Sequence, residues 1–168
     1  GTTAATLLGN KFDSVYIGGA VEIGVPGAGN SAVFTTSDAV LAYLPADGAP
    51  APLSHDLANP TSTSSGVFGG FVLALQLAVD FADAGHLAGT SAVRVGDLTV
   101  CSLTDTPLLN GLTVRQVLAI ANQVLGGSSS PNDFDHLSDL VQALSKSFES
   151  GIPNSFAQQH LVAGACPS

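Results

Sequence analysis

The sequence predicts an α+β fold in which a small β-sheet, built from N-terminal and central strands, packs with a helix-rich C-terminal half. Short glycine-bounded runs rich in β-branched residues occur before residue 36 and again around residues 92–102, which is typical of strands. After residue 113, apolar residues recur at helical spacing in two successive segments. The 168 residues show no internal repeat and no linker between two cores, so we expect one domain over 1–168.

The N-terminal part is expected to form two short helices around a hairpin. In chain order the predicted elements are a helix over 2–16, a strand over 16–25, a turn at 26–30 and a partner strand over 31–35. Ser37 is expected to cap a second helix, which ends at Leu44 because Pro45 cannot continue it.

Residues 45–65 carry four prolines and few large apolar residues, which predicts an extended arm or loop. A connection of about 20 residues is longer than structural links normally require. Two interpretations stay open: an arm that reaches a neighbouring molecule, or an ordered wrap on the surface of its own chain.

The segment 67–84 carries two conflicting patterns. Large apolar residues alternate with small or polar ones between Leu73 and Phe81, which is the period of a strand. The segment is nevertheless long for a strand and rich in Leu and Ala. We predict a buried helix, with strand character near its end as the open alternative.

The C-terminal elements follow from clearer signals. They are a strand over 92–102 with a turn at Gly96-Asp97, a helix capped by Thr113 and ended by Gly126-Gly127, a helix over 133–149, a short helix over 155–162 and a tail over 163–168.

The charge balance excludes several classes of function. Charged residues make up 10% of the chain, and 13 acidic residues against 4 basic ones give a net charge of −9. The basic residues are isolated, whereas binding to phosphates needs clustered cations, so we expect no nucleic-acid partner.

The longest apolar run, residues 67–82, is interrupted by glycine and polar residues, so we expect no membrane span.

Two cysteines, Cys101 and Cys166, stand 65 positions apart. Structural zinc sites use close-spaced ligand pairs, which are missing here. We predict a disulfide that tethers the tail over 163–168 to the strand at Cys101, with two buried free thiols as the alternative. A disulfide indicates an oxidising compartment. Together with the start at Gly1, interpreted as a processed or artificial N-terminus, it predicts a secreted protein. The lack of an Asn-x-Ser/Thr sequon favours a bacterial exported protein.

Three stretches, taken in order, carry a resemblance. They are Phe34-Thr-Thr-Ser-Asp-Ala-Val-Leu-Ala-Tyr-Leu-Pro45, Asn59-Pro-Thr-Ser-Thr-Ser-Ser-Gly-Val-Phe-Gly-Gly70 running on to Val79-Asp-Phe81, and Leu109-Asn-Gly-Leu-Thr-Val-Arg-Gln-Val-Leu-Ala-Ile-Ala-Asn122 running on to Leu125-Gly-Gly127. The set resembles a family of exported bacterial surface proteins that lack an assigned biochemical activity, over residues 10–150. The resemblance implies an extracellular setting and supplies no site residues.

Four residues with oxygen ligands lie close together in the sequence: Asn132, Asp133, Asp135 and Asp139. Hard oxygens in a loop can bind calcium, the one cofactor that the sequence suggests. Their spacing differs from that of an EF-hand, and acidic residues at this place also suit the N-terminus of a helix. A helix cap is therefore the competing interpretation. The chain carries no Gly-x-Ser-x-Gly elbow, and we do not expect an enzyme.

The low charge predicts a surface that favours association. We expect an extracellular structural protein, a self-assembling subunit of a bacterial surface filament or layer, which forms a homo-oligomer or polymer by adding strands to a neighbour's sheet edge. The candidate assembly residues are Ile17, Val21, Ile23, Val25, Pro50, Pro52 and Leu53. The alternative is an adhesin or ligand-binding module of a larger secreted protein, which recognises a carbohydrate or a surface with or without calcium.

Overall fold

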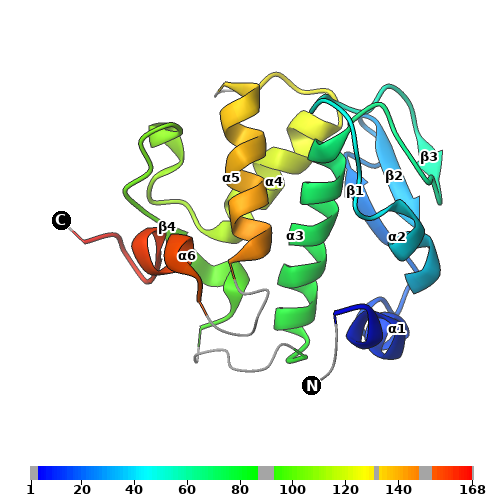
Figure 1. The fold of residues 1–168 in the computed structure, drawn as a ribbon, viewed down its shortest axis with the longest axis horizontal. Helices are drawn as coiled ribbons and strands as arrows, with labels where there is room; N and C mark the ends of the chain where they lie inside the picture. Colours follow the sequence, from blue (N-terminus) through cyan, green and yellow to red (C-terminus); the bar gives the residue numbers. More distant parts are fainter. Residues whose placement is uncertain (1–3, 87–92, 131–132, 148–152, 168) are drawn as a thin grey trace. The chain divides into compact units, whose positions relative to one another are not determined.

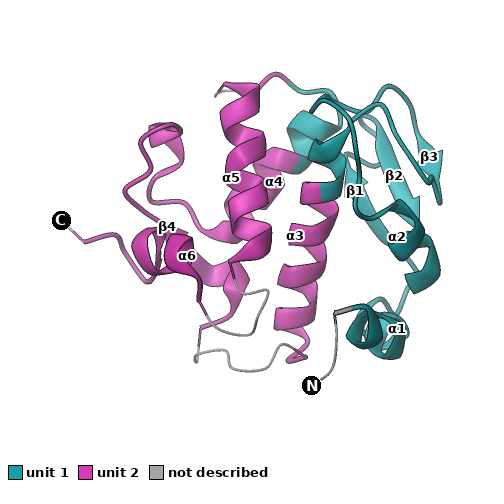
Figure 2. Cartoon of the chain, in the orientation of Figure 1, with its two compact units in different colours: residues 1–70, 122–128 teal, residues 71–121, 129–168 magenta. Residues whose placement is uncertain are grey.

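Helices dominate the computed structural model, which describes residues 4–86, 93–130, 133–147 and 153–167 (Figure 1). Short strands accompany the helices, which confirms the predicted α+β class. The chain forms two compact units, the first comprising residues 1–70 and 122–128 and the second residues 71–121 and 129–168 (Figure 2). Within the described residues, no helix is both long and apolar enough to cross a membrane.

The first unit holds a three-stranded sheet. In chain order its elements are α1 (Ala4–Val15), β1 (Val21–Gly24), β2 (Ser31–Phe34), α2 (Ser37–Tyr43) and β3 (Leu57–Ala58). Strand β2 lies in the middle of the order β1-β2-β3, antiparallel to β1 and parallel to β3. Alternate residues of β1 and β2 are buried, as expected for a sheet with one face against a core.

Two predictions for this unit need correction. The strand predicted over 16–25 begins only at Val21, because the Gly19 N–H donates to the Tyr16 carbonyl (2.8 Å) and closes a turn at Tyr16–Gly19. The helix after β2 is capped by Thr36 and not by Ser37. Thr36 has extended backbone angles and its hydroxyl accepts from the Ala39 N–H (3.0 Å), whereas Ser37 is already helical.

Residues 45–65 fold back over their own unit, and this segment is called the wrap below. The Ala51 N–H donates to the Ser65 carbonyl (3.1 Å), the Leu53 N–H donates to the Leu125 carbonyl (2.8 Å), and Leu57 pairs with Ala32 in the sheet. At the end of the wrap, Gly66 has a φ of +58°, and a Cβ there would lie 2.1 Å from the Ala49 carbonyl oxygen. Glycine at this position therefore lets the wrap close against the start of the next helix.

Most of the helices belong to the second unit. Its elements are α3 (Val67–Asp83, with its first four residues in the first unit), the 3-10 turns Val95–Asp97 and Pro107–Leu109, β4 (Leu98–Val100), α4 (Val114–Leu125, which ends in the first unit), α5 (Phe134–Lys146), α6 (Ser155–His160) and β5 (Leu161–Ala163). The predicted helix over 67–84 is confirmed over Val67–Asp83. The Thr113 cap of α4 is also confirmed: Thr113 and Gln116 exchange side-chain to backbone hydrogen bonds (2.9 and 3.2 Å).

The last predicted helix, 155–162, ends two residues earlier than expected. Asn154 caps α6 by accepting from the Ala157 N–H (2.9 Å), and α6 ends at His160. Leu161, Val162 and Ala163 then form β5, which pairs antiparallel with β4. A strand of three residues forms here because an extended partner is available, and the local sequence does not reveal that partner.

Candidate functional site

The Cys101–Cys166 disulfide joins the C-terminal segment to the end of β4, which confirms the predicted pairing. The same junction carries a reciprocal contact between Cys101 and His160. The Cys101 N–H donates to the His160 carbonyl (2.8 Å), and the His160 Nδ1–H donates to the Cys101 carbonyl (2.9 Å). The tail is thus fixed to the second unit by one covalent bond and by main-chain pairing.

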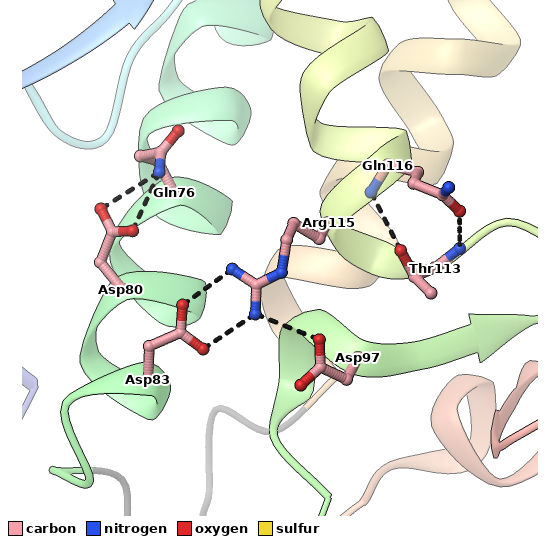
Figure 3. Close-up of polar contacts among 7 residues, drawn as sticks. All are labelled: Gln76, Asp80, Asp83, Asp97, Thr113, Arg115 and Gln116. Carbon is pink, nitrogen blue, oxygen red and sulfur yellow. Dashed lines mark hydrogen bonds and ion pairs between the residues drawn. The ribbon is translucent and has the colours of Figure 1, made fainter.

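A cluster of charged side chains centres on Arg115 at the start of α4 (Figure 3). Its guanidinium donates to both carboxylate oxygens of Asp83 at the end of α3 (2.8 and 2.9 Å) and to Asp97 (3.3 Å). Gly96 allows this approach, since a Cβ there would lie 2.7 Å from Arg115 Nη2. The cluster ties together three elements of the second unit, which gives it a structural role.

Asp83 is the acid most affected by this cluster. The hydrogen bond from Arg115 lowers the pKa of Asp83 below its ordinary value, and the positive charge of Arg115 acts in the same direction. The pKa of Arg115 is raised, mainly by its hydrogen bond to Asp83. Since the Arg115 side chain is 45% exposed, water screens the pair and its contribution to stability is modest.

Replacing Arg115 by glutamine is expected to lower the free energy of unfolding by about 1 kcal/mol at pH 7. Because the folded-state pKa of Asp83 is depressed, its stabilisation is present above its unfolded value near 3.8 and is lost as the pH falls below that value. The free energies of unfolding of the wild type and the variant, measured with urea, should therefore differ less at pH 3 than at pH 7. Lys11→Gln, which removes the same charge from an exposed position of α1, serves as the control. Equal losses at both pH values would contradict this account.

Of the predicted calcium residues, Asp133 and Asp135 lie at the start of α5, and Asp139 lies in the middle of the helix. Asp133 caps the helix, and its carboxylate accepts from the N–H groups of Asp135 (3.0 Å) and His136 (3.3 Å). Asp135 and Asp139 are exposed, and Asn132 lies outside the described residues. Among the residues that the structure describes, no three His, Cys, Asp or Glu side chains lie close enough to share a metal ion. The cap accounts for Asp133, and calcium binding stays a prediction.

The seven predicted assembly residues lie in different environments. Val21, Ile23 and Leu53 are buried within their own unit, so the structure corrects their assignment to an assembly surface. The alternation of β1 turns Val21 and Ile23 to the core, and the pairing of Leu53 with Leu125 draws its side chain inward. Of the remaining four, Val25 and Pro50 are half-buried, whereas Pro52 and Ile17 are exposed.

The wrap also contains a Ser-His-Asp sequence at residues 54–56. Ser54 Oγ lies 2.9 Å from His55 Nδ1 on the exposed surface. The Asp56 carboxylate accepts from the Ser31 N–H at the start of β2 (2.9 Å). The Asp56 contact fastens the wrap to the sheet, whereas the Ser54–His55 contact is local. Consecutive residues in an exposed loop do not provide the converging geometry of a hydrolase site.

Sequence reasoning missed two polar clusters. One is the Arg115 cluster, and the other is a hydroxyl cluster in which Tyr43 Oη lies 3.3 Å from Thr63 Oγ1 and 3.5 Å from the buried Ser65 Oγ. Tyr43 is 20 positions from Thr63, and Arg115 is 32 positions from Asp83, with no local motif to connect them. Only the folded chain brings them together.

No protein-family model, curated protein or solved structure matches this chain. The resemblance to exported bacterial surface proteins therefore stays a prediction from its three sequence stretches. The function has to be argued from the chain's own residues.

Proposed function

We propose that this chain is an extracellular structural domain, a self-associating subunit of a bacterial surface filament or layer. The observation that carries the proposal is the side chain of Ile17, which is 91% exposed. A large apolar side chain held in water loses the free energy that burial would provide, about 1.5–3 kcal/mol for a residue of this type. Contact with a second molecule would recover it.

The backbone at Ile17 is ordered by its neighbours. Ile17 lies in the turn that the Gly19 N–H closes on the Tyr16 carbonyl. The Tyr16 ring packs on the Phe12 ring of α1, with ring centroids 5.0 Å apart, and Phe12 is buried. Because the backbone at Ile17 is already ordered, association costs little backbone entropy there, which favours the use of Ile17 as an anchor.

Further features of the chain support the proposal. Leu41 on α2 and Leu108 in the 3-10 turn Pro107–Leu109 are also large exposed apolar residues, 41% and 71% exposed. The low content of charged residues, 10%, leaves few charged side chains to surround such positions. The disulfide agrees with an oxidising, extracellular setting.

Ile17→Asp is expected to weaken self-association by about tenfold or more, because the anchor is replaced by a charge that resists burial. Light scattering after size separation, over a range of concentrations, measures the mass of each variant. Asn10→Asp is the matched control, since it adds the same charge at an exposed position of α1. The proposal is contradicted if Ile17→Asp associates as strongly as the wild type and the control.

A further inference from the structure

The C-terminal segment, residues 153–167, is held in the second unit with little side-chain burial. Of these residues, all of which the structure describes, Ala157 alone is buried. The segment is fixed instead by the disulfide, by the pairing of β5 with β4, by the Cys101–His160 contact and by Asn154, whose N–H donates to the Ser147 carbonyl (3.0 Å). Main-chain hydrogen bonds and a disulfide can form equally well with a different copy of the same chain.

The surface that receives the segment is the edge of β4. Leu98, Thr99 and Val100 are all buried. On the other edge of β4, the Val100 N–H donates to the Leu112 carbonyl (2.9 Å) and the Val100 carbonyl accepts from the Gly111 N–H (2.8 Å). Strand β4 therefore lies between residues 111–113 and β5. When β5 leaves, β4 exposes an unpaired edge. Another strand can then pair with this edge in the register that β5 had.

We propose that residues 153–167 form an exchangeable arm, in which β5 of one copy pairs with β4 of a second copy and Cys166 of the first closes its disulfide with Cys101 of the second. This inference rests on the proposed self-association and names the segment that makes the link permanent. The exchanged contacts are those already present within one chain, so the intermolecular form gains and loses few contacts. Protein concentration therefore decides between intramolecular and intermolecular pairing. An arm passed from copy to copy gives a covalent dimer or a chain.

A small thiol can catalyse the exchange without net oxidation. Its thiolate attacks the Sγ of Cys166, which is half-buried, whereas Cys101 is 2% exposed. The S–S bond breaks, Cys101 leaves as a thiolate, and Cys166 carries a mixed disulfide with the small thiol. A second copy is opened in the same way by another molecule of the small thiol, which leaves its Cys101 as a thiolate and its Cys166 as a mixed disulfide. That Cys101 thiolate attacks the Cys166 sulfur of the first copy's mixed disulfide and releases the small thiol as its thiolate. The free Cys101 of the first copy closes on the Cys166 of the second, or of a further copy, by the same step. Two copies thus hold two disulfides before and after the exchange, and the small thiol is regenerated.

The test combines two complementary variants, Cys101→Ser and Cys166→Ser, in a glutathione redox buffer. Each variant has one cysteine, so the native pairing can form only between copies. We expect a disulfide-linked heterodimer on a non-reducing gel, with peptide mapping that places the bond between Cys101 and Cys166. Mixed disulfides with glutathione alone, or Cys166–Cys166 homodimers alone, would overturn the proposal.

A third variant tests whether β5 directs this bond. The register pairs Val162 with Thr99 and continues to the pair Cys101–His160, in which the Cys101 N–H faces the partner strand. By the alternation of an antiparallel ladder, the Val162 N–H also faces β4. Adding Val162→Pro to the Cys101→Ser chain removes that donor and should lower the heterodimer yield by about tenfold. An unchanged yield would mean that the cysteines pair without the strand, and would overturn the proposal.

The wild-type chain provides a measurement that does not depend on folding of the variants. Concentrated protein with a trace of glutathione should form disulfide-linked dimers and larger species, which revert to monomers on dilution in the same buffer. Failure to form them overturns the exchange proposal. If the native protein still associates through noncovalent contacts that Ile17→Asp weakens, the proposed function stands without the exchange.

Discussion

Replacing both Cys101 and Cys166 by serine is expected to lower the free energy of unfolding by about 4 kcal/mol. The disulfide closes a loop with a sequence separation of 65, and the chain-entropy model gives a value of this size for such a loop. Urea unfolding followed by far-ultraviolet circular dichroism measures the change.

The reduced wild-type protein provides the control for this comparison. In the presence of a strong reductant it should unfold at the same urea concentration as the double serine variant. A loss below about 1 kcal/mol would mean that main-chain pairing alone holds the segment. The disulfide would then not be what fixes residues 153–167 in place, contrary to the exchange that we propose.

Leu53→Ala is expected to cost about 3 kcal/mol of stability, because it leaves a cavity beneath the wrap formed by residues 45–65. Leu53 is 3% exposed, and its N–H donates to the Leu125 carbonyl within the same unit. Leu108→Ala makes the same chemical change at a side chain that is 71% exposed, and should alter stability by no more than about 0.5 kcal/mol. The same urea series measures both variants.

This pair of variants separates the two interpretations of the proline-rich segment. If the wrap belongs to its own unit, Leu53→Ala destabilises the dilute protein. If the segment instead reaches a neighbouring molecule, Leu53→Ala should leave the dilute protein unchanged and weaken only its association. Equal stability of the Leu53→Ala and Leu108→Ala variants would contradict the buried position of Leu53.

The helices were the most predictable part of the fold, since their signals are local. Thr113 with Gln116 marks the start of α4, and apolar spacing marks α4 and α5. The alternation between Leu73 and Phe81 was ambiguous because α3 is apolar on most of its circumference, so neither period dominates. Strand β5 could not be predicted because its three residues form a strand only by pairing with β4, which is distant in the sequence.

The candidate site was only partly predictable. Two cysteines allow a single pairing, so the sequence left open only whether the disulfide forms or both thiols stay free, and the structure shows the disulfide. In β1, the same apolar pattern fits a core strand and an assembly strand, so Val21 and Ile23 were assigned to the wrong surface. Arg115 could not be connected with Asp83, 32 positions away, without the fold.

The central claim is that this chain associates with copies of itself, and its mass in solution tests that claim most directly. Light scattering of the oxidised wild-type protein, from dilute to concentrated samples, should show a mass that rises above the 16.7 kDa of a single chain. Negative-stain images of the concentrated sample should then show regular fibres or layers. A mass that stays at 16.7 kDa at every concentration would contradict the claim.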